Sequence, residues 1–142
     1  MKAKIEIKSI FGNVLFEFEK ERNSIKDTLI EAVKRGANLV NADLRGADLG
    51  GANLRGANLG GANLGEWSKL QNPSDVLIVG LIGSRNDYTT IFHTDKGVFV
   101  SCGCFRGALD EFEAKVKETH QGNKHERDYL ALIQFAKIKF GV

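Results

Sequence analysis

The side chains that could do chemistry lie mostly in the second half of the chain. One group belongs to the polar turn that follows an apolar run ending at Ile82. Its Ser84 hydroxyl, Arg85 guanidinium and backbone N–H groups could hold a phosphate or a carboxylate. An ordinary solvent-exposed loop with Arg85 in water is the alternative interpretation, and the residues alone leave both open.

Two cysteines and two histidines have a spacing similar to that of a zinc site. One residue separates Cys102 from Cys104, and four separate His120 from His125. The cysteine spacing is shorter than usual, and in an extended strand the two sulfur atoms would lie roughly 6 to 7 Å apart. We therefore interpret Cys102 and Cys104 as buried structural cysteines, with a zinc site as the alternative.

His120 continues the apolar stripe of a predicted helix that begins near Leu109, so its side chain should point inward. A histidine satisfied in the core, or one capping the helix C-terminus, is the simpler interpretation. In the alternative, a turn brings His125 and Tyr129 beside His120 to form a pocket wall. Together with Arg85, these side chains would suit a phosphate-bearing ligand with a base that can stack.

These residues do not form a convincing catalytic set. A nucleophilic pair of Cys104 and His120 would lack a local group that activates the thiol and an Asn or Asp that orients the imidazole. We therefore expect a binding protein without enzymatic activity, cofactor or metal. The expected ligand-binding residues are Ser84, Arg85, Cys104, His120, His125 and Tyr129.

A different periodicity precedes this region. Six consecutive five-residue units run from Ala37 to Glu66, each with Ala, then Asn or Asp, then Leu. A period of five fits neither an α-helix nor a flat strand, so a coiling solenoid is expected. The pattern A-[DN]-L-X-X resembles the pentapeptide-repeat family, which implies a short right-handed quadrilateral β-helix with four units per turn and with Ala and Leu pointing inward. The inward leucines are Leu39, Leu44, Leu49, Leu54, Leu59 and Leu64.

The variable positions of the repeat suit the corners of such a coil. Asn and Asp can hydrogen-bond nearby backbone, and the many glycines permit unusual backbone angles. Thirty residues supply only about one and a half turns, whereas solenoids need several stacked units and protected ends. The coil must therefore be stabilised by packing against flanking segments or against a second copy of the chain. We expect a homo-oligomer, because open β-edges favour pairing.

Some relatives in the pentapeptide-repeat family are DNA mimics that bind topoisomerases. Mimicry needs a long acidic rod. Here the acidic side chains of Asp43, Asp48 and Glu66 are offset by Arg45 and Arg55. We therefore expect no DNA mimicry.

Composition limits the class of protein. The chain has 142 residues, a net charge of +2 and a single proline, which indicates one or two small domains and does not imply nucleic-acid binding. The N-terminal residues alternate charged and apolar side chains, unlike a signal peptide, and no later run reaches transmembrane length. With its two cysteines in no disulfide framework, the protein is expected to be cytoplasmic, without a membrane partner.

Flanking segments complete the predicted architecture, an α+β fold. The N-terminal pattern predicts a β-hairpin turning at Gly12-Asn13, then a helix from a capping box at Ser24 to Gly36 that plugs one end of the coil. After the repeat we predict a three-stranded antiparallel sheet with two helices. The expected units are 1–36 as a hairpin and helix cap, 37–66 as the β-helix, 67–75 as a linker and 76–142 as a C-terminal α+β domain.

The whole layout resembles small proteins common in bacteriophage and prophage genomes, on the stretches Ile82 to Arg85, Gly103 to Phe105 and His120 to Tyr129. The resemblance implies an accessory protein that counters host defence, active in the host cytoplasm, and carries no secure activity of its own. Our leading hypothesis is sequestration of a phosphate-containing ligand such as a signalling nucleotide. The alternatives are surface inhibition of a host defence enzyme and a small thiol- or metal-dependent enzyme.

Overall fold

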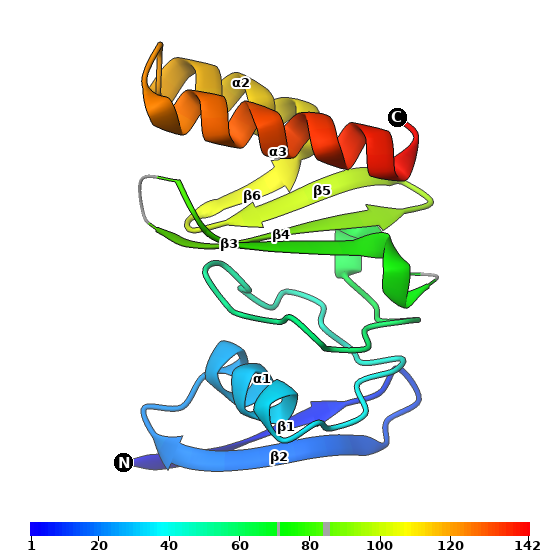
Figure 1. The fold of residues 1–142 in the computed structure, drawn as a ribbon. Coiled ribbons are helices and arrows are strands. Elements are labelled where there is room, and N and C mark those ends of the chain that lie inside the picture. The colour runs from blue at the N-terminus through cyan, green and yellow to red at the C-terminus, as the bar shows by residue number, and fades with distance from the viewer. Residues whose placement is uncertain (71, 84–85) are drawn as a thin grey trace.

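The computed structural model describes residues 1–70, 72–83 and 86–142, and it stacks four layers (Figure 1). A hairpin with one helix lies at one end, the coil of residues 37–66 follows, then a sheet, then two helices. The hairpin strands are β1 (Lys2–Lys8) and β2 (Val14–Glu21), followed by α1 (Ile25–Lys34). The sheet contains β3 (Val76–Ile82), β4 (Asp87–Thr94), β5 (Gly97–Cys102) and β6 (Phe105–Ala108), and the outer helices are α2 (Leu109–Thr119) and α3 (Lys124–Phe140).

The predicted hairpin and helix are confirmed. The two strands pair antiparallel, with Ile5 opposite Phe18. Ser24 caps α1, and its hydroxyl accepts the N–H of Asp27 at 3.0 Å. Only this half of the predicted capping box forms. The Asp27 carboxylate pairs with Lys20 at 3.2 Å, and the N–H of Ser24 bonds to the side-chain oxygen of Asn23 instead.

Every corner of the coil repeats the same local contacts. The Asn or Asp of each unit accepts the backbone N–H two residues later, for example Asp48 from Gly50 at 3.0 Å and Asn58 from Gly60 at 3.1 Å. The N–H of the next alanine then bonds to the preceding leucine, as Ala57 does to Leu54 at 3.1 Å. The fifth position has a positive φ in successive units, which only glycine or Asn tolerates well. It is occupied by Asn41, Gly46, Gly51, Gly56 and Gly61.

Stacking within the coil joins residues about twenty apart, the length of four pentapeptides. The N–H of Leu44 bonds to the carbonyl of Asn63 at 2.9 Å, and the N–H of Asn63 bonds to that of Ala42 at 2.8 Å. In the described coil the β-pairing consists of isolated bridges, such as Asp43 with Asn63, without continuous strands. The closed quadrilateral β-helix therefore stays a prediction.

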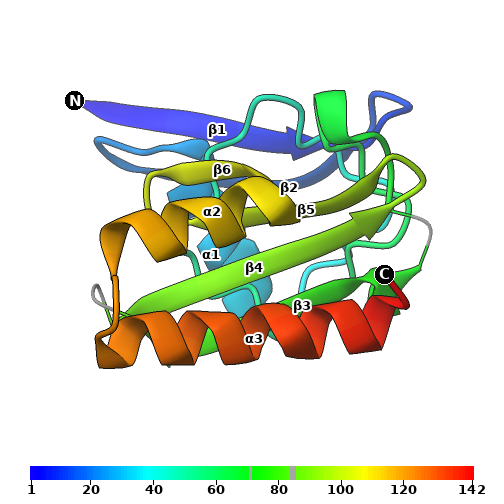
Figure 2. The ribbon, with the colours of Figure 1, turned by 90° about the horizontal axis from the view of Figure 1, so that it is seen from above.

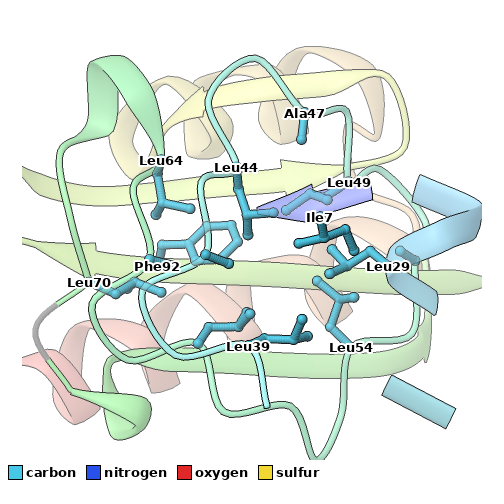
Figure 3. Close-up of a cluster of buried hydrophobic side chains, with 14 of the residues drawn as sticks. Ile7, Leu29, Leu39, Leu44, Ala47, Leu49, Leu54, Leu64, Leu70 and Phe92 are labelled. Atoms are coloured by element: carbon cyan, nitrogen blue, oxygen red, sulfur yellow. The ribbon is translucent and has the colours of Figure 1, made fainter. Parts of the chain in front are cut away.

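The inward leucines form the main core. All six are buried, each at most 3% exposed, together with Leu29 of α1, Ile7 of β1 and Phe92 of β4. Figure 3 shows the labelled leucines pointing into one shared interior. Because this cluster takes side chains from α1 on one side and from the sheet on the other, both ends of the coil are covered by the chain itself.

The predicted linker 67–75 lies against this core over its first part. Trp67 is 4% exposed and Leu70 is fully buried, and the N–H of Gly61 bonds to the carbonyl of Leu70 at 2.7 Å. Short 3-10 helices occupy Gly65–Trp67 and Pro73–Asp75. Trp67 and Leu70 thus pack the end of the repeat against the coil.

The sheet differs from the prediction by one strand. Within the described ranges it is antiparallel in the order β3-β4-β5-β6, so the prediction of three strands was wrong. The fourth strand, β6, has four residues, and the sequence Phe-Arg-Gly-Ala shows no alternation that would reveal it. Both predicted helices are confirmed, and they cover the face of the sheet that is turned away from the coil (Figure 2). In the described part of the chain, no helix has the length and apolar character needed to cross a membrane.

Glu113 joins the two outer helices electrostatically. Its carboxylate accepts from Lys137 of α3 at 2.9 Å and from Lys117 of its own helix at 3.0 Å. These two ammonium groups lower the pKa of Glu113 below its ordinary value. The ion pair therefore stabilises the fold at neutral pH.

We expect Glu113→Gln to lower the free energy of unfolding by about 0.5 kcal/mol at neutral pH, since the pair is partly screened by solvent. A carboxyl with a lowered folded-state pKa stabilises above its ordinary pKa and loses that contribution as the pH falls through the lowered value. Urea unfolding should thus separate variant and parent at about pH 7 and not at about pH 3. Glu118→Gln, on an exposed residue whose nearest ammonium lies at 3.9 Å, is the control. A difference that persists in acid would contradict the assignment.

Candidate functional site

The turn between α2 and α3 brings the two predicted histidines together. His120 occupies the C-cap of α2, where its N–H bonds to the carbonyl of Val116 at 2.9 Å. Asn123 then caps α3 by accepting the N–H of His125 at 2.9 Å and that of Glu126 at 3.1 Å. His120 therefore lies at the C-cap of α2, one of the two positions that the simpler interpretation allowed.

Four rings form a continuous contact at this end of the helices. His120 stacks on Tyr129 with ring centres 5.7 Å apart and an interplanar angle of 27°. The His125 ring meets His120 at 5.6 Å, and Phe112 meets Tyr129 edge-on at 5.5 Å. Tyr129 is only 4% exposed. The structure therefore brings His120, His125 and Tyr129 together, and of these three His120 and Tyr129 line a cavity.

Cys102 of β5 links the sheet to these four rings. The Thr89 hydroxyl of β4 donates to the Cys102 sulfur at 3.2 Å, and Cys102 lies 3.8 Å from the Tyr129 hydroxyl. Cys102 is half-buried, but Cys104 is exposed in the turn between β5 and β6. The prediction that both cysteines are buried was wrong. Gly103 adopts a φ of 57° and turns the chain outward before Cys104.

A cavity of about 280 Å³ opens between the β5–β6 turn and the two helices. One wall is apolar, and the His120 and Tyr129 rings form another. The polar groups at its margin are the thiols, a hydroxyl and one ammonium. The lining residues are Cys102, Cys104, Phe105, Phe112, Lys115, Val116, Thr119, His120 and Tyr129.

His125 contacts the His120 ring but is not among the lining residues of the cavity. Its Nδ1 atom is buried, and no hydrogen-bond partner for it exists among the described residues. A buried polar atom without a partner costs roughly 1 to 3 kcal/mol.

Two of the predicted ligand-binding residues belong to the polar segment that follows β3. Ser84 and Arg85 lie outside the described residues. Gly83, which precedes them, packs on Tyr129 so closely that a Cβ there would lie 1.7 Å from the Tyr129 hydroxyl oxygen. The polar turn therefore starts against the ring cluster. Among the described residues, no three His, Cys, Asp or Glu side chains lie close enough to hold a metal ion.

Sequence reasoning missed two polar residues of the cavity, Lys115 and Thr119. They precede His120 by five residues and by one, and Lys115 and Thr119 share one face of α2. The spacing was readable once the helix was placed. However, their orientation toward Cys104 depends on the β5–β6 turn, which belongs to the strand that the prediction omitted.

Comparison with known proteins bears on the coil. A family model described as pentapeptide repeats, in eight copies, matches residues 35–66. The chain carries pentapeptide repeats. No curated protein and no solved structure matches it. The repeat therefore accounts for the coil, and the cavity lies outside the matched residues.

The pentapeptide repeats pack closely against the sheet. Gly50 of the coil lies against the Gly103 carbonyl of the β5–β6 turn, and Arg106 of β6 donates to the Ala47 carbonyl at 2.8 Å. The Arg106 guanidinium also lies over the Trp67 ring, 4.2 Å from its centre. The β5–β6 turn, which carries the exposed Cys104, and strand β6 are thus held on the coil, and the coil positions one wall of the cavity.

Proposed function

We propose that this pentapeptide-repeat protein is a non-enzymatic binding protein whose cavity takes a phosphate-containing small ligand, such as a signalling nucleotide. The observation that carries the proposal is the stacked pair of His120 and Tyr129 beside Lys115 in one cavity. A flat ring system suits a nucleobase, and an ammonium suits a phosphate. Next to this pair, the buried Nδ1 of His125 has no hydrogen-bond partner among the described residues.

The size of the cavity limits the ligand. At about 280 Å³ it lies near the lower end of ligand pockets, which run from roughly 300 to 1,000 Å³. One nucleotide unit suits this volume better than a large ligand. A cyclic dinucleotide would place one base and one phosphate in the cavity and the rest outside it.

In this proposal the coil is a scaffold. It would be the right-handed quadrilateral β-helix of the family, supported by hydrogen bonds between residues about twenty apart. The resemblance to phage accessory proteins supports a role in countering host defence, in the host cytoplasm, by sequestering the ligand. That role rests on analogy and on the absence of a convincing catalytic set in the sequence.

Thermal-shift screening tests the proposal directly. Cyclic dinucleotides, cyclic oligonucleotides and 5′-mononucleotides would be added to the purified full chain. A ligand that binds only the folded state at a hundredfold excess over its Kd stabilises by about 2.7 kcal/mol, so a clear rise in Tm is expected. His120→Ala and Lys115→Ala should each abolish the shift while the unliganded protein stays folded.

The matched control is a variant of His93, the third histidine of the chain. His93 lies away from the cavity, with its Nδ1 3.7 Å from Asp75 and its ring 5.0 Å from Phe140. His93→Ala should retain the ligand-induced shift. No shift across the panel would overturn the proposal and favour the alternative, inhibition of a host enzyme through a protein surface.

A further inference from the structure

The outer face of α3 carries a row of exposed apolar side chains. Ala131, Phe135 and Ile138 are spaced by four and three residues, so they lie on one side of the helix. Phe135 is 54% exposed and Ile138 is 72% exposed. The opposite side of the helix is the buried one. The row therefore points away from the sheet, and α3 belongs to the outermost layer (Figure 1).

Two charged residues flank this row in a self-complementary way. Asp128 and Lys139 are eleven residues apart, close to three helical turns, and therefore lie on the same flank. Both are exposed, and neither has an ion-pair partner in the part of the chain that the structure describes. The helix thus has an acidic group near its N-terminal end and a basic group in its last turn.

We propose that a second copy of this chain docks on this row, with the two α3 helices antiparallel. A two-fold axis that sets Phe135 over Ala131 of the second copy also sets Asp128 opposite Lys139, because both pairs have nearly the same sum of residue numbers. The small Ala131 leaves room for the large ring. The antiparallel arrangement also opposes the helix dipoles favourably.

This surface replaces the one expected from the sequence. The open ends of the coil were the reason to expect pairing between copies, and both ends are covered by α1 and by the sheet. The row on α3 combines exposed apolar area with charges that match when the helix meets itself. It is separate from the cavity, so the inference does not depend on the proposed function.

Sedimentation velocity over a range of concentrations tests the docking. The parent chain should shift from monomer toward dimer in the micromolar range. Phe135→Asp should abolish the shift. Phe11→Asp, on another exposed phenylalanine in the hairpin turn at 74% exposure, is the control and should leave it unchanged.

A charge exchange makes the test specific for the antiparallel geometry. Asp128→Lys alone and Lys139→Asp alone should each weaken the dimer by about tenfold or more, since like charges then face each other twice across the axis. The double variant should restore the parent affinity. A parent that stays monomeric at every concentration, or a double variant no tighter than the singles, would overturn the proposal.

Discussion

Replacing Leu54 with alanine is expected to lower the free energy of unfolding by about 2 to 5 kcal/mol, the largest effect of any substitution considered for this chain. Leu54 has no exposed surface and lies in the core that α1, the coil and the sheet share. The substitution removes buried apolar surface and leaves a cavity. The walls cannot close over it, because each corner is held by its own turn and by hydrogen bonds to the next turn of the coil.

Urea unfolding followed by circular dichroism measures this loss. Leu81→Ala is the matched control, because it makes the same chemical change on a side chain that is 58% exposed. The control should cost less than about 1 kcal/mol. Equal losses in the two variants would show that the coil interior is not the shared core of the fold.

Replacing Gly50 with alanine is expected to loosen the sheet from the coil. A Cβ at this position would lie 1.9 Å from the Gly103 carbonyl oxygen, far inside van der Waals contact. That oxygen belongs to backbone, so it cannot swing aside like the end of a flexible side chain. Either the β5–β6 turn or the coil corner must move, at a cost of about 1 to 3 kcal/mol.

Trp67 reports on this junction. It is the single tryptophan of the chain, it is 4% exposed, and it stacks on Phe99 with ring centres 5.1 Å apart. Gly50→Ala should therefore shift the tryptophan emission to longer wavelength in the folded protein. Gly56→Ala is the control, because its φ of +87° strains an alanine but no atom lies within 4 Å of its Cβ. It should lose stability without changing the emission.

The site was predictable in part. His120 caps α2, and His125 and Tyr129 lie on α3 after a short turn, so helical spacing and the turn were enough to bring them together. Thr89 and Cys102, by contrast, lie on adjacent strands and reach Tyr129 across the sheet. That contact depends on strand register and on how α3 lies over the sheet, and neither leaves a periodic signal in the chain.

The sequence by itself determined the coil. Each corner is built from contacts within three residues: the Asn or Asp side chain, the turn closed on the next alanine, and a residue that tolerates positive φ. Interactions this local can be read from spacing alone. Only the tertiary structure decided what covers the coil. The covering side chains of Leu29 and Phe92, and the turn that contacts Gly50, come from segments distant from the coil in the sequence. The fourth strand, and with it the exposed Cys104 and the cavity, was decided in the same way, because β6 pairs through its backbone and a strand of four residues is too short to carry a pattern of its own.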